Sequence, residues 1–488
     1  MKKALLWAIS TLLLSQSLCY ASEARVDSMG GLTLIATDES EAINPFTLGN
    51  PAGLALLAPQ SRFDVDAQWV KEYYPPTGDE FHVYGLMSQL NNDTVKYHGL
   101  MVFLNNNWAV QADGDTLHTE SQNDYTTHVD TNDRYRELLR TAYNFGPFVL
   151  GGQVQPTQTT INFKPYDIDL NTKVTSGTGT ENNLTGTAGL LADFSGNSDP
   201  KQSHLRIGGV VSTQLNPAQE TDNLSVLNSG TTSLTLTDTF NESNLLTWGP
   251  EIYFESPGTF EASITGRFSN FNVSYERDSS NPGVFLGTPG FNLETGNAAI
   301  GVAVFKMTNA LTDAINLKTG GLISVESANT GNFTPSESPN GGVSLNAWTA
   351  QAGIGFDHPQ DYTLGVQADF EQINGNESDS SGVTATNNFF DYKIHVGGER
   401  WLSKAWALRV GVIYEDADNM GNAEQDQFLY PILPGERIET TTIVAGIGYQ
   451  DSHLKIDANL SEAQPNLSDD ASNYGNFYGA QIAASLNF

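Results

Sequence analysis

The chain has 488 residues, of which 56 are acidic and 23 are basic, so its formal net charge is −33. Such an acidic chain offers no basic field for phosphate groups, which excludes nucleic acid as a partner. Hydrophobic residues make up 39% of the chain, too few for a bundle of membrane-spanning helices, and the 10% of aromatic residues are too many for a disordered chain. The composition therefore predicts a folded protein that is not a helical membrane protein.

The first 21 residues have the pattern of a secretory signal peptide. Lys2 and Lys3 precede an apolar stretch over residues 4–14, and small residues at Cys19 and Ala21 precede a cleavage site. Cys19 is the single cysteine, so the exported chain has no disulfide to stabilise it. We therefore expect residues 1–21 to be removed during export and the mature fold to rely on backbone pairing and packing.

Residues 22–61 show no alternation of apolar and polar side chains. Their glycines and prolines, as in Asn50-Pro51-Ala52-Gly53, favour a compact irregular segment with short turns. The alternative is a disordered leader. Some apolar residues of this segment could line a ligand pocket, or could equally form its own small core: Leu32, Leu34, Ile35, Phe46, Leu54, Leu56 and Leu57.

From residue 62 to residue 488 the sequence alternates with a period of two, which is typical of β-strands with one apolar face. Tyr392, Ile394 and Val396, for example, alternate with polar residues. The strands are about 10–15 residues long, enough for the 9–11 that a tilted strand needs to cross a bilayer. Short turns alternate with long polar segments, as in outer-membrane barrels. We predict a closed antiparallel transmembrane β-barrel over residues 62–488, with about 14–18 strands; the alternative is a secreted β-sandwich or β-helix.

Three local features refine this prediction. Aromatic residues beside short turns, Trp401 with Trp406 and Phe145 with Phe148, favour a belt at the membrane surface. The apolar face changes parity within residues 260–275, which predicts a bulge near residues 269–270. Long polar segments predict loops at residues 117–131, 165–183, 216–243, 277–293, 328–345, 375–387 and 417–437.

The chain ends in an alternating strand from Tyr478 to Phe488. A terminal phenylalanine on such a strand resembles the signal that barrel-assembly machinery reads in bacterial outer-membrane proteins. The resemblance implies this machinery as a partner and the Gram-negative outer membrane as the location. A barrel of this width has a bore that side chains cannot fill. We therefore predict that residues 22–61 form a plug inside it.

Several motifs resemble the long-chain fatty acid transporter (FadL-like) family. A Met29-Gly30-Gly31 start, an acidic stretch over residues 38–41 and Asn50-Pro51-Ala52-Gly53 directly before the first strand are similar to that family's N-terminal hatch. Toluene-type hydrocarbon transporters and PorV-type barrels are similar there, and residues 392–414 resemble a late hairpin of the family. The resemblance implies a 14-stranded barrel that passes hydrophobic molecules to a pocket beside the hatch and releases them sideways. Asn50, Pro51 and Ala52 would shape the hatch.

The inward positions of the strands argue partly against an apolar path. Charges at this density imply water or paired networks inside the barrel. A hydrophilic, cation-preferring porin is therefore an alternative, and a barrel scaffold for a secretion or electron-transfer complex, with an unidentified protein partner, is another. The charges that should point into the lumen are Asp64, Asp66, Glu261, Arg267, Asp369, Glu371, Lys393, Glu399, Arg409, Lys455 and Asp457.

No pattern indicates an enzyme, a metal or a cofactor. The chain has no GxSxG motif and no CxxCH motif, and its eight histidines lack metal-ligand spacing. Acidic loops, such as residues 415–426, could bridge through divalent ions to lipopolysaccharide phosphates. We therefore expect a hydrophobic small molecule, outer-membrane lipids and lipopolysaccharide as partners.

Overall fold

A computed structural model describes most of the chain. Phe46, Leu57 and Phe488 lie outside the described residues, and so does the signal peptide. The described ranges are residues 23–35, 50–56, 61–73, 89–104, 107–122, 129–163, 165–169, 172–195, 202–228, 232–279, 290–312, 314–331, 342–358, 361–379, 382–420, 437–467 and 476–487.

In the described part of the chain before the first strand there are two short helical pieces, the α-helix α2 (Glu23–Ser28) and the 3-10 helix η2 (Pro51–Leu56). Within the described ranges no helix is long and apolar enough to cross a membrane. The strands are β1 (Arg62–Tyr73), β2 (Gln89–Leu104), β3 (Trp108–Gln122), β4 (Val129–Asn144), β5 (Phe148–Phe163), β6 (Tyr166–Asp169), β7 (Thr172–Asp193), β8 (His204–Asn228), β9 (Thr232–Ser256), β10 (Phe260–Ser279), β11 (Gly290–Ala310), β12 (Asn316–Gly331), β13 (Gly342–His358), β14 (Tyr362–Asp379), β15 (Gly382–Trp401), β16 (Trp406–Asn419), β17 (Arg437–Gln450), β18 (Leu454–Leu467) and β19 (Asn476–Asn487).

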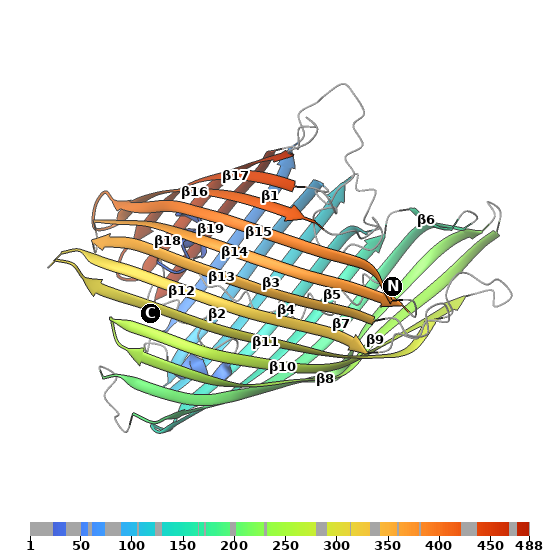
Figure 1. Cartoon of the computed structure of the whole chain (residues 1–488), viewed down its shortest axis with the longest axis horizontal. Coiled ribbons are helices and arrows are strands. Elements are labelled where there is room, and N and C mark those ends of the chain that lie inside the picture. The colour runs from blue at the N-terminus through green and yellow to red at the C-terminus, as the bar shows by residue number, and fades with distance from the viewer. Residues whose placement is uncertain are drawn as a thin grey trace.

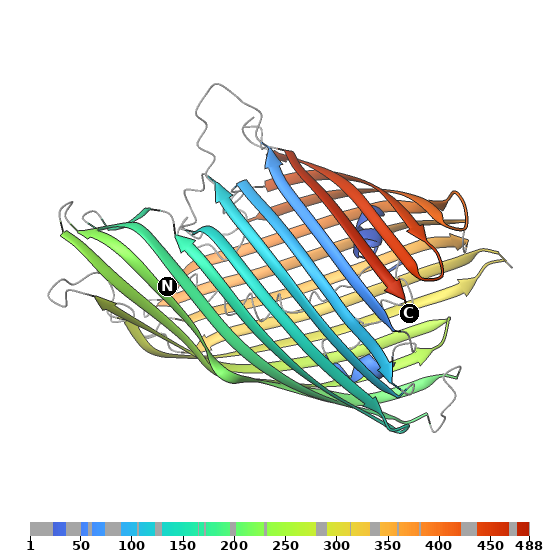
Figure 2. The same cartoon turned by 180° about the vertical axis from the view of Figure 1, so that it is seen from behind.

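The strands form an antiparallel β-barrel (Figures 1 and 2). Each long strand pairs with the next, and β5 pairs directly with β7 because β6 is a short arm beside β7. β1 pairs with β2 and also with β19, from Arg62 opposite Asn487 to Tyr73 opposite Asn476. Without β6, the 19 described strands leave eighteen long ones, which is the upper end of the expected 14–18 and exceeds the 14 that the family resemblance implies.

Burial alternates along the strands as the sequence pattern predicts. In β15, Tyr392 and Val396 are exposed on the outer face, whereas Asp391, His395 and Glu399 are buried on the inner face. Outward side chains of the other strands are also largely apolar. The barrel therefore presents an apolar exterior and a polar interior.

The aromatic residues at the short turns follow the expectation with one exception. Phe145, Phe148 and Trp406 are exposed. The prediction for Trp401 is wrong, because its indole N–H donates to Glu399 Oε1 on the inner face at 3.0 Å. A buried carboxylate attracts the indole donor, which the spacing of aromatic residues does not reveal.

Several segments expected to be loops belong to strands. β8 and β9 occupy most of residues 216–243, and β7 begins at Thr172 within the segment 165–183. Outward residues in this part, such as Asn223 and Thr237, are polar. The alternation of apolar and polar side chains therefore stops before the strand itself ends. Cross-strand hydrogen bonds sustain a strand beyond the apolar exterior.

The bulge lies on a different strand from the one predicted. β10 keeps a regular alternation, and the register with β9 slips between Asn270 and Asn272 because β9 contributes an extra residue there. Phe271 and Val273 therefore point inward and are buried. The change of parity in the sequence marks a change of environment on β10, from an outward to an inward apolar side chain.

Candidate functional site

Two described pieces of the N-terminal segment, residues 23–35 and 50–56, lie against the inner face of the barrel, where α2 and η2 are visible within the ring of strands (Figures 1 and 2). α2 contacts β16 to β19, and η2 contacts β3, β4, β5 and β7. After α2 the chain turns through Gly30 and Gly31, whose φ angles of 75° and 74° favour glycine. Two separate pieces of the segment therefore rest on two separate parts of the wall.

The first piece rests on a row of inward glycines, which we call the first seat. Gly365 of β14 stands opposite Gly397 of β15, and Gly397 opposite Gly411 of β16. A Cβ atom at Gly411 would collide with the backbone of Gly30, and one at Gly397 with the carbonyl of Met29. The absence of side chains lets the two backbones approach. The full row is Gly320, Gly353, Gly355, Gly365, Gly397, Gly411 and Gly446, and it contacts residues 28–35.

The second piece has a smaller seat of the same kind. Gly151 of β5 and Gly189 of β7 are register partners. A Cβ atom at Gly151 would collide with Ala52, and one at Gly189 with the side chain of Asn50. We call these two glycines the second seat.

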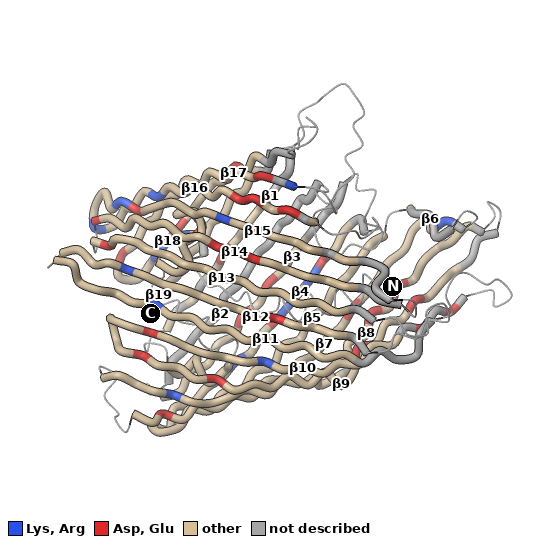
Figure 3. Tube along the Cα trace, in the orientation of Figure 1, with Lys and Arg blue, Asp and Glu red and all other residues tan. Residues whose placement is uncertain are grey.

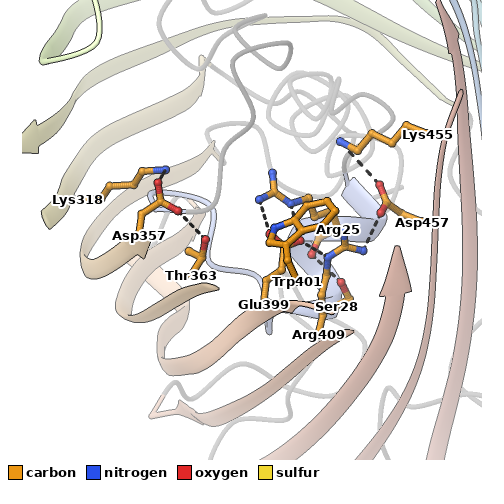
Figure 4. Close-up of polar contacts among 10 residues, drawn as sticks. All are labelled: Arg25, Ser28, Lys318, Asp357, Thr363, Glu399, Trp401, Arg409, Lys455 and Asp457. Atoms are coloured by element: carbon orange, nitrogen blue, oxygen red, sulfur yellow. Dashed lines mark hydrogen bonds and ion pairs between the residues drawn. The ribbon is translucent and has the colours of Figure 1, made fainter. Parts of the chain in front are cut away.

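A buried ion network ties α2 to the first seat (Figure 4). Arg25 donates from Nε and Nη2 to the Glu399 carboxylate at 3.1 and 2.9 Å. The same carboxylate accepts from Arg409 Nε at 2.7 Å, and Arg409 Nη1 donates to Asp457 Oδ1 at 2.7 Å. The side chains of Glu399, Arg409 and Asp457 are at most 2% exposed, and that of Arg25 is 16% exposed. Glu399 thus joins the wall to the N-terminal segment.

Polar side chains of the wall hold the backbone after α2. His395 Nδ1 donates to the Gly30 carbonyl at 2.6 Å. The Gln367 side-chain carbonyl accepts from the Leu34 N–H at 3.0 Å, and Lys306 donates to the Thr33 carbonyl at 3.3 Å. These contacts satisfy backbone groups that have no partners in a helix or strand.

The second seat repeats the chemistry of the first. Asn50 donates from Nδ2 to Glu251 Oε1 at 2.6 Å, and its Oδ1 accepts from the Ala52 N–H at 3.0 Å. Glu251 is 1% exposed and is paired with Arg267 of β10 at 3.2 Å. At both seats, a wall glutamate beside a wall arginine accepts a hydrogen bond from the N-terminal segment. Asn50, Pro51 and Ala52 are buried, and Gly53 donates to the Asn50 carbonyl.

The apolar residues expected to line a pocket pack against the wall. Leu32 is buried beside Met29, and Leu34 and Ile35 form a cluster with Tyr253 and Val304. Leu54 is buried, with Leu56 at the margin, in a cluster that includes Ala52, Ala55, Ala109, Ala142, Val149 and Leu191.

Apart from Asp64, the expected lumen charges lie on the inner face and are mostly paired; Figure 3 marks charged residues along the strands. Beyond the networks above, Lys393 contacts Asp391 and Glu415 at 2.9 and 2.8 Å. Asp369 lies 3.1 Å from His395 Nε2. Asp66 accepts from Gln481, Lys455 lies 3.8 Å from Asp457, and Glu261 and Glu371 are half-buried. The side chain of Asp64 lies outside the described part, and Tyr478 is exposed on β19.

An inward apolar cluster near the end of the barrel with the long strands was not expected. Phe271 and Val273 of β10 pack with Ala298, Ala328 and Leu345, and Phe240, Leu245 and Ile373 complete the contact. We call it the outer cluster. The change of parity in β10 was the signal that could have revealed it.

Carboxylates gather nearby on β7, β8 and β9, beyond the exposed Leu215 and Leu246. Glu181 stands opposite Glu220, and Asp222 opposite Asp238. The pKa of Glu220 is raised to about 8, mainly because the carboxyl group is buried and to a smaller extent because Asp222 is nearby. Burial and Asp238 raise the pKa of Asp222 to about 7, and burial also raises that of Glu242 to about 7.

One group of side chains resembles a catalytic triad in composition only. Asp193, Ser195 and His204 lie together, but Ser195 Oγ and Asp193 Oδ2 both contact His204 Nδ1, at 3.1 and 2.7 Å. A triad needs the serine and the carboxylate on opposite ring nitrogens. Among the described residues, no group of three or more potential ligands is arranged to hold a metal ion.

Comparison with known proteins identifies similar folds only. No protein-family model and no curated protein matches the chain. The CymD monoaromatic hydrocarbon channel is 10% identical, over 96% of this chain and 97% of that one, with a TM-score of 0.33. The ferric citrate transporter FecA (11%, over 87% and 78%, TM-score 0.40) and the ferric yersiniabactin receptor FyuA from Yersinia pestis (8%, over 88% and 81%, TM-score 0.36) are also similar. None of these likenesses is strong enough to carry an argument about function.

Proposed function

We propose that this protein is a plugged barrel of the bacterial outer membrane that transports hydrophobic small molecules, such as fatty acids or hydrocarbons. In this proposal residues 1–21 direct export, residues 22–61 form the plug, and residues 62–488 form a closed transmembrane barrel. The observation that carries it is the seating of the N-terminal segment on the inner wall. Two glycine seats, each beside a buried glutamate and arginine, hold the described pieces of this segment against the inner face, which supports a plug.

The outer face supports a lipid environment. Exposed apolar side chains cover successive strands, for example Leu364 and Val366 of β14 and Leu408 and Val410 of β16. Exposed aromatic side chains stand at the short turns, where the headgroup layer would lie. Lipid offers no hydrogen-bond partners to a free strand edge, which favours a ring of strands with every edge paired.

The interior supports an apolar cargo. Inward positions of membrane barrels are ordinarily polar, yet the outer cluster brings Phe271, Val273 and Leu345 together on the inner face. Leu34 and Ile35 form a second inward apolar cluster on the N-terminal segment. A hydrophobic molecule that enters from outside would meet the first cluster and end beside the second.

The wall has an irregular stretch that supports lateral release. β8 loses regular register with β7 near Leu184 and with β9 between Thr213 and Ala218. Pro217 lies within this stretch and has no N–H to donate. Because a strand with interrupted ladders on both sides separates more easily, residues 214–217 are our candidate for the lateral opening.

Mass spectrometry of protein purified from native membranes tests the proposal. We expect hydrophobic small molecules to be retained by the full chain and lost when residues 22–61 are deleted, while heat-modifiable migration on gels shows that the barrel still folds. Retention of none by the full chain contradicts the transport of hydrophobic molecules.

A hydrophilic, cation-preferring porin is the second candidate, because acidic side chains predominate on the inner face of β7 to β9 near Glu181, Glu220 and Asp222. Planar-bilayer conductance separates the two. A steady, large, cation-selective current through the full chain supports the porin, and a closed state that opens when the N-terminal segment is removed supports the plugged transporter.

A further inference from the structure

A groove lies on the outer face of the barrel where β16, β17 and β18 lie side by side (Figure 1). Its volume is about 300 Å³, and its lining is almost entirely apolar. Ala458 of β18 lines it and stands between two larger outward side chains, Ile447 of β17 and Ile482 of β19, which are 44% and 54% exposed. The small methyl group between two isoleucines leaves the hollow. A groove of this size and lining is of the kind that accepts an apolar ligand.

An aromatic pair lines the groove near the short turns. Trp406 stands opposite Tyr449, and their ring centroids are 5.0 Å apart. The Tyr449 hydroxyl donates to Asp451 Oδ2 at 3.0 Å, which holds the ring in place. Within the described part of the chain, the Trp406 indole N–H has no hydrogen-bond partner. Such rings belong at the level of the lipid headgroups, where ester carbonyls of the lipid accept hydrogen bonds.

Two opposite charges stand on the turns beside the groove. Lys404 is exposed in the turn before Trp406, and it has no carboxylate partner among the described residues. Asp451 is exposed in the next short turn. The Gln450 N–H donates to the Ala405 carbonyl at 2.8 Å, which joins the two turns. A cation and an anion are therefore held on adjoining turns at the edge of an apolar groove.

These features match a phospholipid whose headgroup carries both charges. The short turns of outer-membrane barrels face the periplasm, and phospholipids make up the leaflet on that side. Lys404 would pair with the phosphate and Asp451 with an ammonium group, while an acyl chain fills the groove. A headgroup with a phosphate and no ammonium group would place its charge beside Asp451 without compensation. The turns therefore favour an ethanolamine headgroup over a glycerol headgroup.

We propose that this groove binds a phospholipid of the periplasmic leaflet and selects phosphatidylethanolamine through Lys404 and Asp451. The inference rests on the membrane placement in the proposed function. It depends neither on the cargo of the barrel nor on the plug.

Native mass spectrometry of the full chain tests the selection of the headgroup. The chain is supplied in detergent with equal amounts of phosphatidylethanolamine and phosphatidylglycerol that have the same acyl chains. We expect bound phosphatidylethanolamine to be several-fold more abundant. Asp451→Asn should abolish this preference, because it removes the charge and keeps an oxygen for the N–H groups of His453 and Leu454. Lys404→Gln should lower the binding of both lipids several-fold. Equal binding of the two lipids to the wild type, or an unchanged preference in Asp451→Asn, overturns the inference.

A second pair of variants tests the groove itself. Ala458→Phe fills the groove, and Ala352→Phe is the matched control at an exposed alanine of β13 outside it. Both should migrate as folded barrels on gels, and only Ala458→Phe should lose the bound phospholipid. The inference is wrong if both variants retain it equally, or if Ala458→Phe separates copies of the chain without a change in bound lipid, because the groove would then be a contact between copies. A wild-type chain that does not insert into lipid vesicles refutes the proposed function, whereas an inserted chain without bound phospholipid refutes this inference alone.

Discussion

Replacement of Arg25 by alanine should release α2 from the first seat. The change removes two charge-assisted hydrogen bonds to Glu399, at 3.1 and 2.9 Å. Such bonds contribute about 1.5–3 kcal/mol each at most, and Arg25 is partly exposed, which weakens them. Glu399 keeps Arg409 as its partner, so the variant avoids the 3–5 kcal/mol or so of an orphaned buried charge. We expect a loss of about 2 kcal/mol, or about thirtyfold in the docking equilibrium.

Single-channel recording in planar bilayers measures this equilibrium as the fraction of time spent open. Arg25→Ala should open about thirtyfold more often than the wild type, given that loss of about 2 kcal/mol, without a change in the stability of the barrel. Lys318→Ala is the matched control, because Lys318 pairs with Asp357 on the inner face at 3.3 Å (Figure 4). Openings that are as rare in Arg25→Ala as in the wild type, or as frequent in Lys318→Ala, refute the reasoning.

Three further changes test other parts of the structure. Gly411→Ala should displace the N-terminal segment, because a Cβ atom there collides with Gly30 and overpacking of this kind costs about 1–3 kcal/mol. The conductance of the barrel should therefore rise. Gly301→Ala is the control and should leave the conductance unchanged, because the Cβ position at Gly301 has open space around it. The pKa of Glu220 is raised to about 8, so between about pH 4.3 and pH 8 this side chain keeps a proton in the folded state that it loses in the unfolded state. The unfolding free energy of the outer part of β8 should therefore fall as the pH rises through this window, by up to about 1.4 kcal/mol per pH unit. Limited proteolysis at pH 5 and pH 8 should show this trend, Glu220→Gln should flatten it, and greater resistance at pH 8 would contradict it. Leu460 points outward and is 68% exposed. Leu460→Arg should destabilise the barrel by about 2–4 kcal/mol in lipid vesicles, whereas Leu460→Phe should not. Equal unfolding midpoints of the two variants would argue against lipid at this face.

Alternation in the sequence predicted which face of each strand is apolar, because that pattern depends only on neighbours along the chain. Tyr392 and Val396 are exposed and Glu399 is buried, as the alternation of β15 indicates. The outward polar residues of β8, by contrast, lie beyond the apolar exterior, where a strand carries no apolar alternation on that face. Sequence periodicity therefore predicted the apolar exterior better than the full length of the strands.

The two seats could not be predicted from the sequence, because they depend on register between distant strands. Gly365, Gly397 and Gly411 form a row only when three strands are aligned. The contact between Arg25 and Glu399 joins residues that are 374 positions apart. Alternation placed Glu399 and Arg409 on the inner face, but it contained no information on which N-terminal side chain would reach them.

The repeated use of a wall glutamate beside a wall arginine gives the seats a common energetic property. Glu399 is paired with Arg409 and Glu251 with Arg267, and all four side chains belong to the wall. Each carboxylate therefore keeps a charged partner when the N-terminal segment leaves, which avoids the cost of an orphaned charge. Docking adds hydrogen bonds from Arg25 or from the neutral Asn50 side chain to a carboxylate that is already paired. A segment held in this way can bind firmly and still leave the wall without an unpaired charge, which is what the proposed plug would require.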